Sequence, residues 1–319
     1  MTQAESPYAA DFRGQAVLIT GGAGFIGSHL AHRLVELGAA VRVIDDLSSG
    51  HRENLPKEKL SLHEASILDD DVLRDAVAGC RYVFHLAAMV SVPQSVAEPM
   101  RCAQVNITGT ERVLEAARDA GVQRFVLASS AAVYGDEPSL PSRETDPIDC
   151  CSPYAASKAA GEGLVSAFGR CYEMSTVSLR FFNVFGPRQD PKSPYAAAIA
   201  AFVDAFAAGR RPTIFGDGLQ TRDFIHIDNI VHGVLLAATC ARDLRGAVMN
   251  LGCAAQVSLL DVIDVLNEAT GQRLEPVFAE PRPGDVRHSA ANIDCAREVL
   301  GFEPLVGFAE GLGGMIVVG

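Results

Sequence analysis

The sequence predicts an α/β fold built on a doubly wound parallel sheet, followed by a smaller C-terminal α/β domain. Short apolar runs alternate with longer helical patterns across residues 16–183, which is typical of parallel strands covered by helices on both faces. A glycine-rich turn at 20–28 joins the first strand to the first helix. After Asn183 the alternation gives way to Pro-rich loops, and this change predicts the second domain.

The elements of the main sheet follow in chain order. The first strand is the apolar run "AVLIT", and the first helix is amphipathic and ends at Gly38. The expected strands are 16–20, 40–45, 82–88, 124–129 and 175–183, and the expected helices between them are 25–38, 71–79, 106–121 and 152–172.

The later segments are less regular. Residues 184–195 and 277–289 are Pro-rich, and "PTIFGDG" at 212–218 indicates a short strand and a turn. We expect 224–240 and 247–252 to return to the main sheet. The predicted division is therefore interleaved, with 1–182 plus about 219–251 in one domain and about 183–218 plus 252–319 in the other.

Composition narrows the class of protein. The chain has 319 residues, of which 48% are hydrophobic and 21% charged, and this is ordinary for a globular protein. The net charge is −12, and no run of Lys or Arg supplies the basic face that nucleic-acid binding needs. We therefore expect no nucleic-acid partner, and an anionic ligand has to be held by a few arginines and helix N-termini.

Cysteine usage and hydropathy indicate a cytoplasmic location. The eight cysteines include the adjacent pair Cys150–Cys151, but they form no CxxC and no zinc spacing, so we expect reduced thiols and no metal site. The N-terminus lacks the apolar core of a signal peptide. The apolar run 195–209 is too short to cross a bilayer and contains Asp204, so we expect no membrane partner.

The turn "LITGGAGFIGSHL" places Gly21, Gly24 and Gly27 three residues apart between a strand and a helix. Glycines permit a tight turn, and the helix N-terminus offers free N–H groups to a pyrophosphate. A packing turn would explain the glycines taken alone, but the strand–turn–helix context favours dinucleotide binding.

Asp45 ends the second strand, where a carboxylate accepts hydrogen bonds from an adenosine ribose. A 2′-phosphate about 4 Å away would be repelled by ~4 kcal/mol per charge at an effective dielectric of ~20. Asp46 adds to this repulsion, so the sequence favours NAD over NADP. The alternative is that Asp45 is a solvated acid at a strand end.

Tyr154 and Lys158 lie four residues apart on one predicted helix, so both side chains can reach one site. A free tyrosine titrates near ~10. A neighbouring cation such as Lys158, helped by an oxidised nicotinamide, can lower the tyrosine pKa and make Tyr154 a general base. A YxxxK pair by itself is more often a surface pair, and only its combination with the glycine turn and a serine-ended strand is specific.

The whole set of motifs resembles the extended short-chain dehydrogenase/reductase family, and within it the UDP-hexose 4-epimerases. The motifs span nearly the whole chain and read "TGGAGFIG", "DDLSSG", "HLAA", "SSAAVYG", "YAASK", "RFFNVFGPRQ", "RDFIHIDNI" and "RPGDV". The resemblance implies a Rossmann-type domain that retains NAD and a smaller C-terminal substrate-binding domain for the nucleotide sugar. It also implies a homodimer formed through the helices at about 106–120 and 153–172, whose alanines Ala155, Ala156 and Ala159 would allow close approach.

The resemblance assigns roles to particular residues. The implied catalytic residues are Ser130, Tyr154 and Lys158. The implied cofactor-binding residues are Gly21, Gly24, Phe25, Ile26, Gly27, Asp45, Asp46, Ser66, Ile67, Leu86, Ala87, Ala88, Asn106, Tyr154 and Lys158. The implied substrate-binding residues are Ser130, Asn183, Phe215, Arg222, Arg282, Asp285 and Ser289.

The resemblance also implies the reaction. Relatives that dehydrate or decarboxylate a nucleotide sugar carry an acid just after the serine, where this chain has Ala131 and Ala132. Alanine cannot move a proton, which leaves oxidation of the C4 carbinol to a 4-keto sugar and its reduction from the opposite face. The expected substrates are UDP-GlcNAc/UDP-GalNAc and UDP-glucose/UDP-galactose. The alternatives are a UDP-glucuronate 4-epimerase, in which Arg188 pairs with the carboxylate, and a non-catalytic NAD-binding regulator.

Three positions bear on affinity and specificity. Ser66 stands where relatives usually carry an aspartate near the adenine, which removes about one hydrogen bond worth ~1 kcal/mol. Ala132 replaces a hydroxyl residue that is common in the epimerases. Ser289, seven residues after Arg282, occupies the position at which a tyrosine would restrict the pocket to glucose and galactose. A serine there predicts room for an N-acetyl group.

Overall fold

A single parallel sheet forms the centre of the molecule. The structure is a computed structural model that describes residues 7–190, 198–281 and 286–317. The seven strands lie in the order β11-β6-β5-β4-β1-β2-β3, and every neighbouring pair is parallel. Their bounds are β1 Ala16–Thr20, β2 Ala40–Asp45, β3 Leu60–Glu64, β4 Tyr82–His85, β5 Arg124–Ser130, β6 Thr176–Phe181 and β11 Ala247–Leu251.

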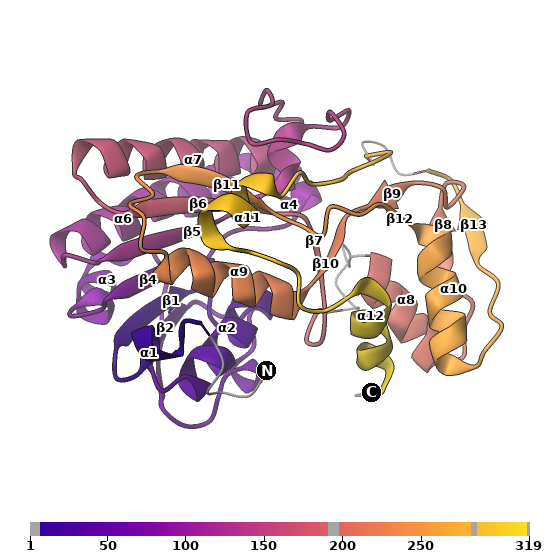
Figure 1. Cartoon of the computed structure of the whole chain (residues 1–319), viewed down its shortest axis with the longest axis horizontal. Coiled ribbons are helices and arrows are strands. Elements are labelled where there is room, and N and C mark those ends of the chain that lie inside the picture. Colours follow the sequence, from indigo (N-terminus) through magenta and orange to yellow (C-terminus); the bar gives the residue numbers. More distant parts are fainter. Residues whose placement is uncertain (1–6, 191–197, 282–285, 318–319) are drawn as a thin grey trace.

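Helices cover both faces of this sheet (Figure 1), as a parallel sheet with apolar side chains on both faces requires. One face packs against α1 Ala9–Phe12, α2 Phe25–Glu36, α9 Ile227–Thr239 and α11 Asp294–Leu300, and the other against α3 Asp70–Val77, α6 Gly109–Asp119 and α7 Pro153–Cys171. The first core contains Leu30 and Leu34, and the second contains Val113 and Val165.

Short helical segments lie near the carboxyl ends of the strands. They are η2 Arg52–Asn54, α4 Val92–Ala97, α5 Pro99–Ala103, the π-helical turn η3 Gln104–Thr108, and η4 Ala131–Tyr134. Segments α5, η3 and α6 follow one another without a loop, so Pro99 to Asp119 forms one continuous helical path.

The C-terminal part is built from short strand pairs and three helices, on the right of Figure 1. The strand pairs are β7 Asn183–Phe185 with β10 Phe224–His226, β9 Thr221–Arg222 with β12 Val257–Ser258, and β8 Thr213–Phe215 with β13 Val277–Ala279. The helices are α8 Ala198–Ala207, α10 Leu259–Thr270 and α12 Phe308–Val317. A third apolar cluster, which includes Phe202, Ile214 and Leu266, fills the space between them.

The strand order reverses between β1 and β4, because the chain runs from β1 to β2 on one side and to β4 on the other. Loops that leave two such strands diverge and open a crevice at the carboxyl edge of the sheet. The turn after β1 and the segment after β4 therefore define the expected ligand position.

The sequence predicted the sheet well. The α/β class with a doubly wound parallel sheet is confirmed, and the strands predicted at 16–20 and 40–45 have those bounds in the structure. The strand β3 was not predicted, and the segment 224–240 contributes β10 and helix α9. The interleaved domain boundaries remain a prediction. Within the described residues, no helix is both long enough and apolar enough to span a bilayer.

Candidate active site

The glycine turn after β1 packs too closely on its neighbours to carry side chains at Gly21 and Gly27. Gly21 has φ +71°, and a Cβ added there would lie 2.6 Å from the Ala87 backbone nitrogen. A Cβ on Gly27 would lie 2.2 Å from the Gly21 carbonyl oxygen, so helix α2 packs on the turn only with glycine at this position. Among the described residues, no side chain caps the N-terminus of α2 at Gly24. Its first N–H groups, including those of Phe25 and Ile26, can therefore hold a pyrophosphate.

Asp45 is buried at the end of β2 and faces the glycine turn. Its two carboxylate oxygens accept hydrogen bonds from Ala23 N at 2.8 Å and Leu47 N at 2.9 Å. Burial raises the pKa of this carboxyl, and the two backbone hydrogen bonds oppose the shift. Asp46 is exposed and accepts from Ser48 instead, so of the two acids Asp45 is the one aimed at the turn.

The end of β4 is fixed by a buried hydrogen-bond chain that the sequence did not predict. Thr110 Oγ1 donates to the Asn106 carbonyl at 2.6 Å and so accepts from His85 Nε2 at 2.9 Å. His85 Nδ1 then accepts from Thr20 Oγ1 at 2.7 Å, and Thr20 Oγ1 accepts from Ala87 N at 3.3 Å. Burial, together with the charge of Lys158, lowers the pKa of His85 to about 3, so the ring is neutral.

The other residues predicted to bind the cofactor lie around this crevice. Leu86, Ala87 and Ala88 follow β4 and are half-buried beside the glycine turn. Ser66 is half-buried after β3 and accepts from Leu68 N at 3.2 Å, and Ile67 is buried against Gly109.

Asn106 connects the end of β4 to helix α7. Its side chain exchanges two hydrogen bonds with the Met89 backbone, at 2.7 and 3.0 Å, and donates to Ser157 Oγ at 2.9 Å. Every polar atom of this amide is therefore used by the protein itself. In this geometry Asn106 orients the residues around a cofactor, and its predicted direct contact with the cofactor remains a prediction.

Ser130, Tyr154 and Lys158 meet at the carboxyl end of β5. The Tyr154 hydroxyl is hydrogen-bonded to the Ser130 side chain, and Lys158 Nζ lies 5.8 Å from the centre of the Tyr154 ring. Burial raises the pKa of Tyr154, and the hydrogen bond with Ser130 opposes that shift. Burial lowers the pKa of Lys158 to about 8, while nearby Cys102 and Glu162 act in the opposite direction. Lys158 Nζ also donates to the Ala128 carbonyl at 2.8 Å, which fixes its position.

A buried ion pair lies behind these residues. Arg180 on β6 donates from Nε and Nη2 to the two carboxylate oxygens of Glu162, at 2.9 and 2.7 Å. Ser129 Oγ donates to the same carboxylate at 2.5 Å, and the Arg180 guanidinium lies 4.8 Å from the centre of the Tyr134 ring. Because Glu162 follows Lys158 by four residues on α7, this cluster ties the catalytic helix to β5 and β6.

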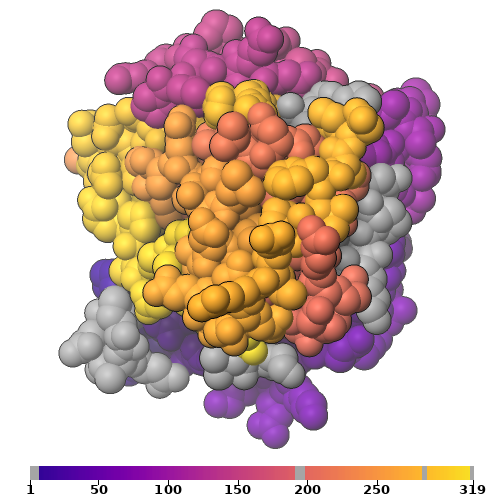
Figure 2. Space-filling view, turned by 90° about the vertical axis from the view of Figure 1, so that its right-hand side faces the viewer, coloured from indigo at the N-terminus to yellow at the C-terminus, as the bar shows by residue number. Residues whose placement is uncertain are grey.

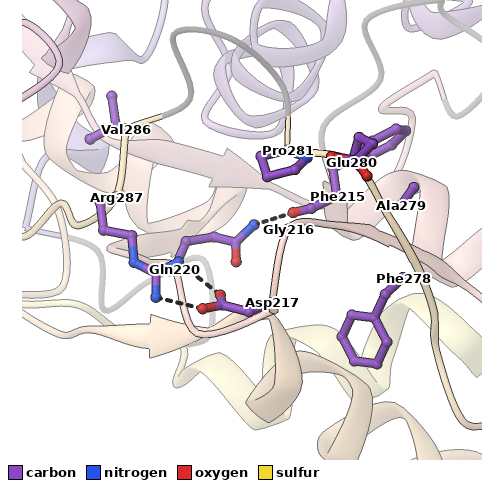
Figure 3. A pocket seen from close by; sticks show the side chains of 10 residues that line it. All are labelled: Phe215, Gly216, Asp217, Gln220, Phe278, Ala279, Glu280, Pro281, Val286 and Arg287. Atoms are coloured by element: carbon purple, nitrogen blue, oxygen red, sulfur yellow. Dashed lines mark hydrogen bonds and ion pairs between the residues drawn. The ribbon is translucent and has the colours of Figure 1, made fainter.

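The C-terminal part contains a cavity of about 640 Å³. Figure 3 shows Phe215, Phe278 and Pro281 around it, with Gln220 donating to the Phe215 carbonyl at 2.7 Å. Arg287 forms a two-point ion pair with Asp217 at the edge, at 2.7 and 2.9 Å. The mainly apolar lining with a few polar groups suits a flat base better than a phosphate.

Two of the predicted sugar-side residues, Asn183 and Ser289, lie next to each other. Ser289 Oγ is 3.5 Å from Asn183 Oδ1, and Ser289 N donates to the Thr221 carbonyl at 3.1 Å. Arg222 on β9 is half-buried and donates to the Thr221 carbonyl at 2.9 Å. The predicted residues Arg282 and Asp285 lie outside the described residues.

Asp223 is a structural acid of this region that was not among the predicted site residues. It is fully buried and accepts from Cys253 N at 2.7 Å and Ala291 N at 3.0 Å. It thereby joins β9 and β10 to two loops of the C-terminal part. Its position in the sequence, directly before an apolar strand, could have indicated a buried acid with hydrogen-bond partners, because an unpartnered buried charge is costly.

The reversed strand order, the glycine turn, the buried acid after β2 and the Ser–Tyr–Lys group together define an α/β enzyme that uses a dinucleotide. Comparison with known proteins agrees. The family model described as "NAD dependent epimerase/dehydratase family" matches residues 17–252. The chain therefore belongs to the NAD-dependent epimerase/dehydratase family.

Individual relatives cover nearly the whole chain. A UDP-glucose 4-epimerase of Mycolicibacterium smegmatis is 42% identical over 302 residues, which are 92% of this chain and 95% of that protein. A UDP-N-acetylglucosamine 4-epimerase from Methanobrevibacter ruminantium M1, solved with UDP-N-acetylmuramic acid, has a TM-score of 0.91 at 37% identity and covers 96% of this chain and 98% of its own. A UDP-glucose 4-epimerase from Thermotoga maritima, solved with UDP-glucose, has a TM-score of 0.90 at 38% identity, with 95% and 98% covered.

Proposed function

We propose that this NAD-dependent UDP-sugar 4-epimerase acts on both UDP-GlcNAc and UDP-glucose, giving UDP-GalNAc and UDP-galactose. The observation that carries the choice of sugars is the small Ser289 side chain beside Asn183, at 3.5 Å between the two side-chain oxygens. The relatives support the broader activity, because they include epimerases named for UDP-glucose and for UDP-N-acetylglucosamine.

In the proposed reaction the protein moves one proton at the sugar 4-hydroxyl. NAD, held by the glycine turn and Asp45, would supply the acceptor and donor of the hydride at C4. Tyr154 takes the hydroxyl proton as the 4-keto sugar forms, and Ser130 holds the same oxygen by a hydrogen bond. Tyr154 gives the proton back to the oxygen when C4 is reduced from its opposite face, which inverts that carbon.

Lys158 makes this proton transfer feasible at neutral pH. Burial alone raises the tyrosine pKa, so Tyr154 needs a neighbouring positive charge to act as a base. The ammonium of Lys158 is held close to the ring by the Ala128 carbonyl. Ala131 and Ala132 follow directly on η4 and carry no acid that could remove water or a C5 proton.

At the sugar end, discrimination comes mainly from the removal of a clash. The Ser289 backbone is pinned to Thr221, so a tyrosine at this position would place its ring beside Asn183. The N-acetyl group adds little attraction to the protein, because one or two buried carbons contribute only ~1–2 kcal/mol of binding free energy. Steric exclusion is the larger part of specificity here.

The test is to incubate the protein with UDP-GlcNAc, UDP-glucose and UDP-glucuronate separately, without added reductant, and to resolve the C4 epimers. We expect turnover of the first two by wild type. Ser289→Tyr should lose UDP-GlcNAc activity and keep UDP-glucose activity, whereas the matched control Ser289→Ala should keep both. A Ser289→Tyr variant that keeps its activity on UDP-GlcNAc relative to UDP-glucose would contradict the assignment.

The two alternatives give different results in the same assay. A UDP-glucuronate 4-epimerase would turn over only the third sugar. It would also need an arginine at the sugar carboxylate, but Arg188 lies against α2 and donates to Ser28 Oγ at 3.1 Å. A non-catalytic regulator would bind the sugars and convert none of them.

The homodimer is the second part of the proposal. On α4 and α5, next to α7, the apolar side chains of Val92, Val96 and Met100 are 41%, 62% and 81% exposed, and a second copy would cover them. Ala156 is also exposed, whereas Ala155 is buried within the chain and so is not available for this contact. We expect a dimer mass by light scattering at micromolar concentration, and a monomer mass would refute the proposal.

A further inference from the structure

Two neighbouring thiols lie beside the catalytic helix and have no part in the proposed epimerisation. Cys150 and Cys151 are both exposed and both free, in the connection between β5 and α7. This connection stands at the top of the molecule in Figure 1, and the magenta surface in Figure 2 shows it open to solvent. Oxidants in solution can therefore reach it.

The residue before the pair is fixed against η4. Asp149 N donates to the Val133 carbonyl at 2.9 Å. Gly135 has φ +80°, and a Cβ added there would lie 2.8 Å from both the carbonyl oxygen and a carboxylate oxygen of Asp149. Since η4 begins directly after Ser130, Asp149 cannot shift toward it without moving the end of β5.

The residue after the pair is fixed as the N-cap of α7. Ser152 Oγ accepts from Ala155 N at 3.1 Å, and the Ser152 carbonyl accepts from Ala156 N at 3.0 Å. Tyr154 N in turn donates to Ser95 Oγ at 3.1 Å. The two cysteines therefore bridge two anchored points, one attached to Ser130 and the other to Tyr154.

We propose that Cys150 and Cys151 form a modification site for two-electron thiol oxidants such as hydrogen peroxide, and that closure of a Cys150–Cys151 disulfide inactivates the enzyme. One thiolate attacks the peroxide, giving a sulfenic acid and one water once the released hydroxide is protonated. The second thiol attacks that sulfur and releases another water. Two thiols and one peroxide thus give one disulfide and two waters, and a dithiol reductant reverses the change.

Ring closure has to deform the backbone. Cα atoms of adjacent residues are ~3.8 Å apart, whereas a disulfide usually joins Cα atoms about 4.4–6.8 Å apart. Because Asp149 and Ser152 are both anchored, the deformation is passed to η4 or to the first turn of α7. Either way a catalytic side chain moves, and a misplacement of about 1 Å can cost roughly 10²-fold in rate. The same strain makes the disulfide easy to reduce.

The surroundings of the thiols slow their oxidation at neutral pH. Burial, the carboxylate of Asp149 and the neighbouring thiol raise the pKa of Cys150, and Glu162 and Arg180 act on it in opposite directions. For Cys151 a backbone hydrogen bond with Asp136 lowers the pKa, but desolvation and the carboxylates of Asp136 and Asp149 outweigh it. Thiolate is therefore scarce at neutral pH and increases as pH rises.

The experiment treats the NAD-loaded protein with hydrogen peroxide at about pH 7 and at about pH 8.5 and follows intact mass and epimerisation together. We expect the mass to fall by two hydrogen atoms, with faster loss at the higher pH. Activity should fall by roughly 10²-fold and return with dithiothreitol. The double variant Cys150→Ser/Cys151→Ser should show no two-hydrogen loss and should keep its activity under peroxide, whereas Cys171→Ser, at another exposed thiol, should behave like wild type.

Two outcomes would overturn the inference: inactivation of the double variant by peroxide, or a disulfide between these residues that leaves activity intact. The activity readout rests on the proposed epimerase function, but the mass readout does not. If epimerisation is absent before treatment, the proposed function fails, and a mass loss that maps to Cys150–Cys151 still identifies the oxidation site.

Discussion

Two two-point arginine–carboxylate pairs lie in opposite environments. One lies behind Ser130, Tyr154 and Lys158, here called the chemical end, and the other lies beside the cavity of the C-terminal part, here called the binding end. At the chemical end, the Arg180 and Glu162 side chains are 3% and 5% exposed, and Ser129 shares the carboxylate. At the binding end, the Arg287 and Asp217 side chains are 53% and 52% exposed at the edge of the cavity in Figure 3. The same kind of ion pair therefore contributes very differently to stability in the two places.

The difference in burial between the two pairs indicates which part of the protein has to be rigid. A buried charge whose partner is removed has no water to replace that partner, so the Glu162 cluster holds α7, β5 and β6 in one arrangement. An exposed pair exchanges its partners for water at little cost. Proton transfer needs fixed distances, whereas a site that takes more than one sugar, as we propose for this protein, gains from an end that can adjust.

The largest expected effect is at the chemical end and concerns rate. Tyr154→Phe keeps the ring and removes the group that takes the proton. General base catalysis is typically worth ~10²–10⁴-fold, so kcat should fall at least by that factor while UDP-sugar binding survives. Steady-state kinetics and a binding titration measure the two quantities, and near-wild-type epimerisation would eliminate Tyr154 as the base.

The next effect concerns stability at the same end. Glu162→Gln leaves Arg180 buried without a charged partner, and the free energy of unfolding should fall by ~3–5 kcal/mol. Urea denaturation of wild type and variant, at the same NAD concentration, measures the difference. A change no larger than that of an ordinary surface substitution would mean that water reaches the pair and that the chemical end is less rigid than its burial indicates.

The smallest effect is the matched substitution at the binding end. Asp217→Asn makes the same carboxylate-to-amide change in the exposed pair, and the denaturation midpoint should stay at its wild-type value. A shift comparable to that of Glu162→Gln would remove the contrast between the two ends. A change confined to KM for the UDP-sugar would instead strengthen the contrast, because the Arg287–Asp217 pair would then affect substrate binding and not stability.

Much of the sheet and cofactor loop could be predicted from sequence because their signals are local. The strand β1 is a continuous apolar run, and the Gly21–Gly27 spacing follows from backbone contacts that exclude any Cβ. The strand β3 was missed because "LSLHE" is half polar and lies at the edge of the sheet, where few apolar side chains are required.

The missing parts of the site depend on residues distant in sequence. The chain from Thr20 through His85 to Thr110 joins three segments, and no spacing rule brings them together. Asn106 was assigned to the cofactor by the resemblance, and no signal in the sequence indicated that its amide bonds to Met89 and Ser157; its contact with the cofactor stays a prediction. The resemblance placed Ala155 at a dimer surface, and only the packed fold shows that this side chain is buried.

The π-helical turn η3 changes the direction in which side chains point around the axis of an unbroken helix. One residue added to an α-helix rotates all the following side chains by ~100° about the helix axis. A π turn accommodates one extra residue without breaking the helix. The α5 side of the path can thus place Cys102 against Ser157, while the α6 side presents Val113 and Leu114 to the sheet. Deleting one residue from 104–108 would turn one half of the path against the other, so the length of this segment is constrained as tightly as its composition.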